Sequence, residues 1–304
     1  MSRRLVVALV VLIGCSLLAR GQSNANPCIN QPGTLYCLAP NSYGNGFVSP
    51  NPFTPVMASI GGQLSMVPLA SPASGIVYVL DPSLKIPVAA GTETFGPVLV
   101  ERGETLGARK LFLASTYQYF SFSSIDSVKL NNIPILFNVC DPSDGQCGPI
   151  ATSNRLDPKI NQVAFFGTYG ITSRIDVSVA LPINSARLTV AATGCTPPYC
   201  KTQVFSNQQQ ISFTPTESAR ETATGIGDVA LRVKAQVYRG ERIRVAAGVD
   251  VRTPTGNALN FLGTGAIGVK PFAAISRSGR LAPHVNVAYQ WNGSSIIGGS
   301  TPGV

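Results

Sequence analysis

Charged residues are scarce in this sequence, and histidine, tryptophan and long apolar runs are scarcer still. Only 12% of the 304 residues are Asp, Glu, Lys or Arg, and the chain has one histidine and one tryptophan. Apolar residues make up 44%, which is too many for a disordered chain. Beyond the first twenty residues, no run approaches the roughly 18 apolar residues that a membrane-spanning helix requires. The sequence therefore excludes a disordered chain and a bundle of transmembrane helices.

Residues 1–21 have the pattern of a cleaved secretory signal peptide. Two arginines precede the apolar run LVVALVVLIGCSLLA, and small residues at positions 19 and 21 offer a cleavage site before Gln22. One alternative is a membrane anchor, although the apolar core is short and no stop-transfer flank follows it. Another is a lipoprotein box, LIGC, with lipidation of Cys15. We expect an exported chain, either soluble outside the cytoplasm or inserted in a membrane as a β-barrel.

The balance of charge argues against nucleic acid as a partner. Removal of residues 1–21 takes away three arginines and no acidic residue, so the formal net charge falls from +9 to +6. This excess is modest, and no Lys/Arg-rich run with interleaved aromatic residues accompanies it.

Six cysteines remain after the signal peptide, as three close pairs in segments rich in Pro, Gly or Asn. In an oxidising compartment we expect three local disulfides that staple loops. Sequence alone leaves about fifteen pairings open. A zinc site is the alternative, but no histidine lies near any pair. The expected disulfides are Cys28–Cys37, Cys140–Cys147 and Cys195–Cys200.

The chain divides into an irregular N-terminal segment, residues 22–70, and an all-β domain, residues 71–304. Residues 22–70 have many turn-forming residues and no sustained alternation, whereas residues 229–237 and 243–251 have an apolar residue at every odd position and mostly polar residues between them. Such alternation around the Arg239-Gly240 turn predicts a hairpin of two strands. Residues 201–224 are expected to be a long loop. Further strands are predicted at 75–80, 110–122, 128–139, 163–171, 175–183, 187–193, 267–276 and 281–292.

Strands of this length, short turns on one side and an export signal are typical of an antiparallel transmembrane β-barrel of the outer membrane. A soluble β-sandwich also alternates and is the main alternative. Two features favour the barrel: cations gather on one face of successive strands, and Tyr289 and Trp291 lie at a strand end on the apolar face, where an aromatic girdle belongs. The candidate lumen-facing residues are Arg232, Lys234, Arg242, Arg244, Asp250, Arg252, Lys270 and His284.

Two compatible roles are open for these charges. A basic lumen attracts anions and biases the selectivity of a pore. Alternatively, Arg–Asp pairs across strands hold the wall together and fill its interior.

Three segments carry a family resemblance: GIGDVALRVKAQVYRG, then VAAGVDVRTPTGNALNFLGTG, then KPFAAISRSGRLAPHVNVAYQWNGSS. They resemble the family named for a "MetA-pathway of phenol degradation", and residues 68–300 are similar to it. The resemblance implies an outer-membrane barrel that passes small hydrophobic or aromatic compounds. Members of the family continue to a terminal aromatic residue, whereas this chain ends in GGSTPGV without a final predicted strand. We therefore expect a partial, C-terminally truncated barrel.

No residue constellation predicts an enzyme, a cofactor or a metal site. Glu101 and Glu104 are expected to pair with Arg102 or Arg109 rather than to perform acid–base catalysis. The lone His284 has no serine-centred motif to serve. The glycines of residues 254–265 lack the Lys-Ser/Thr of a phosphate loop and are expected to form a turn.

The sequence thus predicts an outer-membrane channel or transporter for passive passage of small molecules, with outer-membrane lipid as its surroundings. The alternative is a secreted or surface β-sandwich that binds a ligand and has no transport role.

Overall fold

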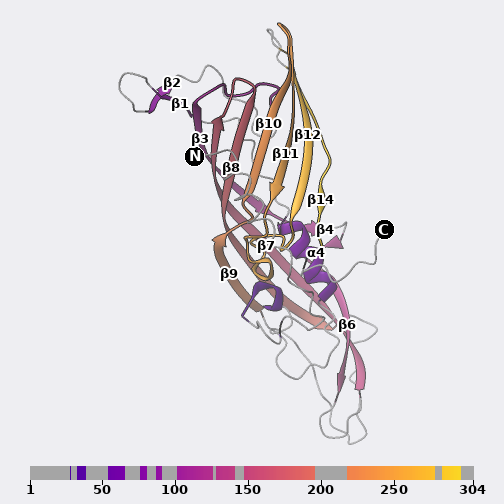
Figure 1. Ribbon diagram of the computed structural model, residues 1–304. Coiled ribbons are helices and arrows are strands. Elements are labelled where there is room, and N and C mark those ends of the chain that lie inside the picture. Colours follow the sequence, from indigo (N-terminus) through magenta and orange to yellow (C-terminus); the bar gives the residue numbers. More distant parts are fainter. Residues whose placement is uncertain are drawn as a thin grey trace, which may run out of the picture.

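The computed structural model describes residue 28 and residues 33–38, 54–65, 76–80, 87–90, 101–125, 128–140, 147–195, 218–277 and 283–295. The expected signal peptide, with Cys15, lies outside these residues. The described part is dominated by one 12-stranded antiparallel sheet, which curls into an open half-barrel (Figure 1). The all-β class predicted from the sequence is confirmed at this level.

The order of the strands in the sheet, β13-β12-β11-β10-β8-β7-β3-β1-β2, is close to their order along the chain. Strand β9 extends the edge of β8 below β10, β6 extends the edge of β7 below β3, and β14 pairs with β12. A separate hairpin joins β4 to β5. The strands are β1 (Ile76–Leu80), β2 (Pro87–Ala90), β3 (Lys110–Ser121), β4 (Ser124–Ile125), β5 (Val128–Lys129), β6 (Ile133–Cys140), β7 (Cys147–Gly170), β8 (Ile175–Cys195), β9 (Ser218–Ile226), β10 (Ala230–Arg239), β11 (Ile243–Arg252), β12 (Gly268–Arg277), β13 (His284–Ala288) and β14 (Trp291–Asn292).

Several predicted boundaries are wrong in instructive ways. The segments predicted at 175–183 and 187–193 are one continuous strand, β8, because the Asn184-Ser185-Ala186 step between them stays paired with β7. Of the loop predicted at 201–224, residues 201–217 lie outside the described residues, and the rest is wrong because Ser218 begins strand β9, whose polar residues face outward. The predicted irregular N-terminal segment contains a helix, α4 (Thr54–Ser65), beside the short 3-10 helix η1 (Leu35–Cys37).

One expected disulfide is confirmed: Cys28 and Cys37 are bonded, with Cα atoms 5.4 Å apart. Cys140 and Cys147 are register partners where β6 meets β7, but their side chains are outside the described part. Cys195 ends β8, and Cys200 falls outside the described residues.

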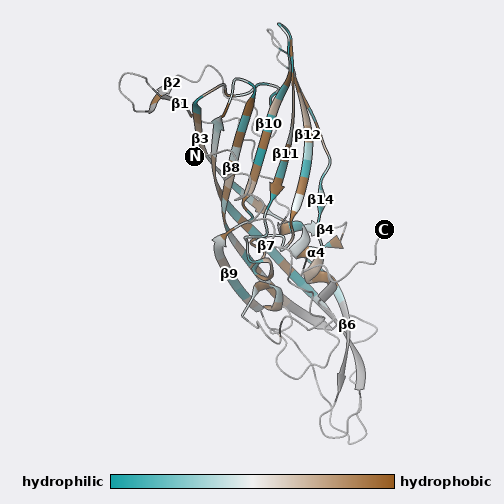
Figure 2. Cartoon of the chain, in the orientation of Figure 1, coloured by the Kyte–Doolittle hydropathy of each residue, from teal (hydrophilic) through white to brown (hydrophobic). Residues whose placement is uncertain are grey.

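The upper part of the sheet, toward the β10–β11 turn, carries its apolar side chains outward. Leu231 and Val233 of β10 are each 47% exposed, and the residues that alternate with them, Arg232 and Lys234, face the concave side. Brown and teal residues accordingly alternate along β10, β11 and β12 (Figure 2). On β8 the same outward row runs from Ile175 to Ile183, about nine residues, and includes no charge.

The lower part reverses this arrangement on the same strands. Val163 and Ile183 are register partners and end the apolar outer row, and the next outward pair is polar, Asn161 and Ser185. Below that level the apolar residues point inward, with Leu188 and Val190 fully buried. Since side chains alternate strictly along a strand, the reversal requires a change of residue type rather than a change of register.

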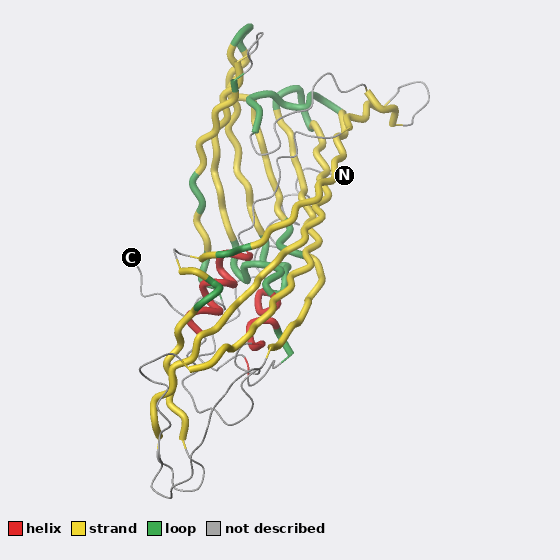
Figure 3. Tube along the Cα trace, turned by 180° about the vertical axis from the view of Figure 1, so that it is seen from behind, coloured by secondary structure: helices red, strands yellow, loops and turns green. Residues whose placement is uncertain are grey.

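The lower part has its own hydrophobic core. Side chains of β7, β8, α4, η1 and η2 (Ala258–Asn260) meet there, among them Met57, Ile60 and Phe261, each at most 1% exposed. The helical segments are seen enclosed by the strands at one level of the sheet (Figure 3). They close the concave side beneath the upper part.

Leu188→Ala should therefore destabilise the protein by about 2 to 5 kcal/mol, since a fully buried leucine leaves a cavity. Urea unfolding followed by circular dichroism measures the loss. The control is Thr189→Ala, the outward neighbour on the same strand, which should cost under about 1 kcal/mol. Equal losses would contradict the placement of the core.

Candidate functional site

The candidate site is the concave inner face of the upper part. Of the predicted lumen-facing residues, all but one lie on inward positions of β10, β11, β12 or β13: Arg232, Lys234, Arg244, Asp250, Arg252, Lys270 and His284. Arg242 differs, because it precedes β11 in the exposed β10–β11 turn. The sequence pattern had placed Arg242 with the inward residues because they all occupy even-numbered positions.

Arg232 is the centre of this face. Its Nε and Nη2 donate to Asp250 of the neighbouring strand at 2.5 and 2.7 Å, and its Nη1 donates to Glu101. The guanidinium also lies 4.9 Å from the ring centroid of Phe272, two strands away. With its side chain only 16% exposed, Arg232 satisfies its charge through these partners rather than through water.

The other inner cations are paired as well. Lys234 lies 3.4 Å from Glu101, Lys270 lies 3.0 Å from Asp250, and Arg244 lies 3.0 Å from Glu104. Arg252 lies 3.9 Å from Asp228. The row of cations that the sequence predicts is therefore interleaved with carboxylates, which cancels most of its net field. Cross-strand pairing, one of the two roles left open above, describes this geometry well.

A segment preceding β3 supplies two of these carboxylates. Residues 101–109, called the inner segment below, cross the concave face from β12 to β7. The Gly103 N–H donates to Ser276 at 2.7 Å, and the Leu106 N–H donates to Asp176 at 2.7 Å. At its end the Arg109 N–H donates to the Gly170 carbonyl at 2.7 Å. The inner segment is thus tied to both sides of the curl.

Close backbone approach explains two glycines. A Cβ on Gly103 would collide with the carbonyl oxygen of Arg244, and a Cβ on Gly170 would collide with that of Gly107. Only glycine permits the inner segment to lie this near the strands.

The partners of Glu101 and Glu104 differ from the expected ones. The sequence suggested Arg102 or Arg109, but the ion pairs join Glu101 to Arg232 and Lys234, and Glu104 to Arg244. Those partners lie more than a hundred residues further along the chain. No sequence pattern near residues 101–104 indicates these ion-pair partners.

His284 is held by a serine. Ser276 Oγ lies 2.7 Å from His284 Nδ1 and accepts the Gly103 N–H, and Ser276 is fully buried. A buried hydroxyl engaged on two sides positions the inner segment against β12 and β13 and is poorly placed to attack a substrate.

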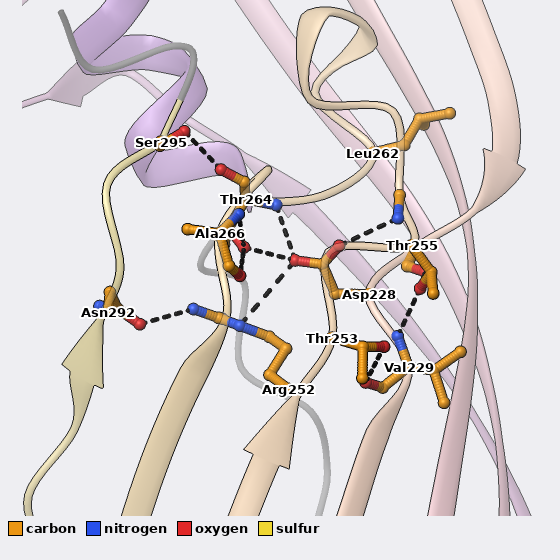
Figure 4. Close-up of polar contacts among 12 residues, drawn as sticks. Asp228, Val229, Arg252, Thr253, Thr255, Leu262, Thr264, Ala266, Asn292 and Ser295 are labelled. Carbon is orange, nitrogen blue, oxygen red and sulfur yellow. Dashed lines mark hydrogen bonds and ion pairs between the residues drawn. The ribbon is translucent and has the colours of Figure 1, made fainter. Parts of the chain in front are cut away.

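A second polar cluster lies at the lower end of the site, where the chain leaves β11 for η2. The Asp228 carboxylate accepts from the Thr264 N–H at 2.7 Å, the Thr264 hydroxyl at 2.6 Å and the Gly256 N–H at 3.0 Å. Figure 4 shows this carboxylate at the centre of the contacts, with Arg252 beside it and Asn292 beyond. The residues predicted as a plain turn therefore form an inward loop anchored on one buried acid.

Aromatic residues mark both ends of the apolar outer band. At its lower end, Tyr289 and Trp291 pack edge to face with ring centroids 4.7 Å apart, and they are 64% and 55% exposed. Exposed Tyr117 and Tyr119 of β3 are the register partners of Val163 and Asn161, where the outer face changes from apolar to polar. Exposed Tyr169 and Tyr238 lie toward the upper turns.

Within the described residues, no group of three or more His, Cys, Asp or Glu side chains is arranged to hold a metal ion. None of the described helices is long and apolar enough to cross a membrane. Comparison with family models, curated proteins and solved structures finds no match.

Asp228→Asn should destabilise the protein by about 1 to 3 kcal/mol, because an amide nitrogen cannot accept the hydrogen bonds that converge on this 5% exposed carboxylate. Asp157→Asn is the matched control, since that carboxylate pairs only with Lys159 on the outer surface and its loss should cost under about 1 kcal/mol. Urea unfolding compares the two. A loss at position 157 as large as that at 228 would contradict the anchoring role.

Proposed function

We propose that this chain forms the wall of an outer-membrane β-barrel that conducts small molecules passively. The observation that carries the proposal is the reversal of the apolar face at a single level of β7 and β8. An apolar outer row of about nine residues is the length of strand that crosses a bilayer at a tilt. Exposed aromatic rings at both ends of the row are what an interfacial girdle requires.

The soluble β-sandwich accounts less well for the outer face. A sandwich buries one face of each sheet against a second sheet, about 10 Å away. In the described part of the chain no second sheet covers the outer face of β8, β10, β11 or β12, and residues such as Val179 and Ile275 remain 43% and 46% exposed. Lipid is the medium in which that face is stable.

The inner face favours neutral solutes over free anions. Each cation that β10, β11 and β12 place on the inner face has a carboxylate within 4 Å, so little net potential is left to select charge. The inner segment lies across the concave face between β12 and β8, so a solute that moves along this face passes beside it. Small neutral compounds, including the aromatic ones that the family resemblance implies, fit such a passage.

Membrane insertion is tested by a matched pair of substitutions on the outer face of β8. Val179→Arg, within the apolar band, should make insertion less favourable by about 2 to 4 kcal/mol. Thr189→Arg, on the same face but below the reversal, should insert as the unchanged protein does. The fraction that resists carbonate extraction and shows heat-modifiable gel mobility is measured. A protein that stays soluble without detergent, or two variants that behave alike, would overturn the proposal.

Passage is tested by the swelling of proteoliposomes in solutions of a neutral sugar. The unchanged protein should raise swelling above that of empty vesicles. Glu101→Gln should raise it several-fold further, because the inner segment then loses its ion pairs to Arg232 and Lys234. Glu241→Gln, in the exposed β10–β11 turn, is the control and should change nothing. Inserted protein that permits no swelling in any form would contradict a conducting role.

A further inference from the structure

A set of exposed cations surrounds the upper end of the apolar band. They lie in turns or at strand ends, and among the described residues of these turns Glu241 is the acidic one. This set, called the cationic rim below, is Arg109, Lys110, Arg174, Arg239, Arg242 and Arg277.

The cationic rim differs from the inner cations in its partners. Each inner cation of β10, β11 and β12 lies within 4 Å of a carboxylate. Among the residues that the structure describes, no rim cation is in an ion pair of that kind. Within the described residues, the carboxylates of the concave face pair with the inner cations, and no rim cation has such a partner within 4 Å.

The rim cations directly adjoin the outward apolar residues. Arg174 immediately precedes Ile175, and Arg242 immediately precedes Ile243. Arg277 is the register partner of Ile243 on the next strand. Long cationic side chains at this position keep their aliphatic stems on the apolar surface and place the charge at the level of lipid headgroups.

We propose that the cationic rim binds the phosphate groups of anionic phospholipids. The assignment rests on the proposed function, because it needs the apolar band to lie in a bilayer. Guanidinium groups match phosphate oxygens in two-point hydrogen bonds, which accounts for five arginines among six cations. The rim thus selects the lipids at one boundary of the membrane and fixes the depth of the sheet.

The test uses full-length protein in non-ionic detergent micelles, titrated with phosphatidylglycerol or with phosphatidylcholine. Native mass spectrometry measures the apparent dissociation constant for each lipid. Phosphatidylglycerol should bind the more tightly. The triple variant Arg174→Gln/Arg242→Gln/Arg277→Gln should lose about fivefold in affinity for each cation removed, or roughly a hundredfold together.

The matched control removes three exposed cations of the lower part, far below the band: Lys129→Gln/Arg155→Gln/Arg220→Gln. It should retain the preference for phosphatidylglycerol. Equal affinities for the two lipids, or equal losses in the rim and control variants, would overturn the assignment. Displacement of the lipid by inorganic phosphate at the same concentration would identify a free-anion site and also overturn it.

The two proposals fail in different ways. Protein that carbonate extracts from membranes contradicts the outer-membrane wall itself. Protein that resists extraction but shows no lipid preference contradicts the rim alone.

Discussion

At one level of the sheet the apolar side chains change from the outer face to the inner face. The other features of the structure are arranged around that level. Above the Val163–Ile183 pair the outer face is apolar and the inner face polar, and below it the two are exchanged. A continuous pair of long strands, β7 and β8, carries both arrangements in one register. The upper part therefore presents an apolar outer face, and the lower part presents a polar outer face and has a packed core within.

Polar groups on the inner face then need partners, because burying an unpaired charge is costly. The inner segment meets this need by bringing Glu101 and Glu104 to Arg232, Lys234 and Arg244. In return, the strands position the segment through Ser276 and Asp176. Strand pairing and the shape of the inner face are therefore coupled. Below, the Asp228 cluster and the core around Phe261 close the same space from the other side.

Much of the upper part was predictable because alternation is a local property. The hairpin of β10 and β11, the outward row from Ile175 to Ile183 and the placement of Tyr289 and Trp291 follow from period-two patterning. The reversal along β8 was present in the residues as well, since Ala186, Leu188 and Val190 share the parity of the inner face. It was missed because the apolar parity changes at residue 184, where a strand break was expected. Arg242 was misplaced for a related reason, since parity has no meaning once a strand gives way to a turn.

The sequence by itself determined which face of each strand is apolar, because side-chain direction follows from position along an extended chain. It also suggested the Cys28–Cys37 disulfide by the short spacing of the two residues, a pairing that the structure selects from the alternatives. Tertiary structure alone decided which carboxylate neutralises which cation, since Glu101 and Arg232 meet only after the sheet curls around the inner segment. Tertiary structure likewise decided which of the described cations have no carboxylate within 4 Å. Both outcomes depend on contacts between residues far apart in the chain, which no local pattern specifies.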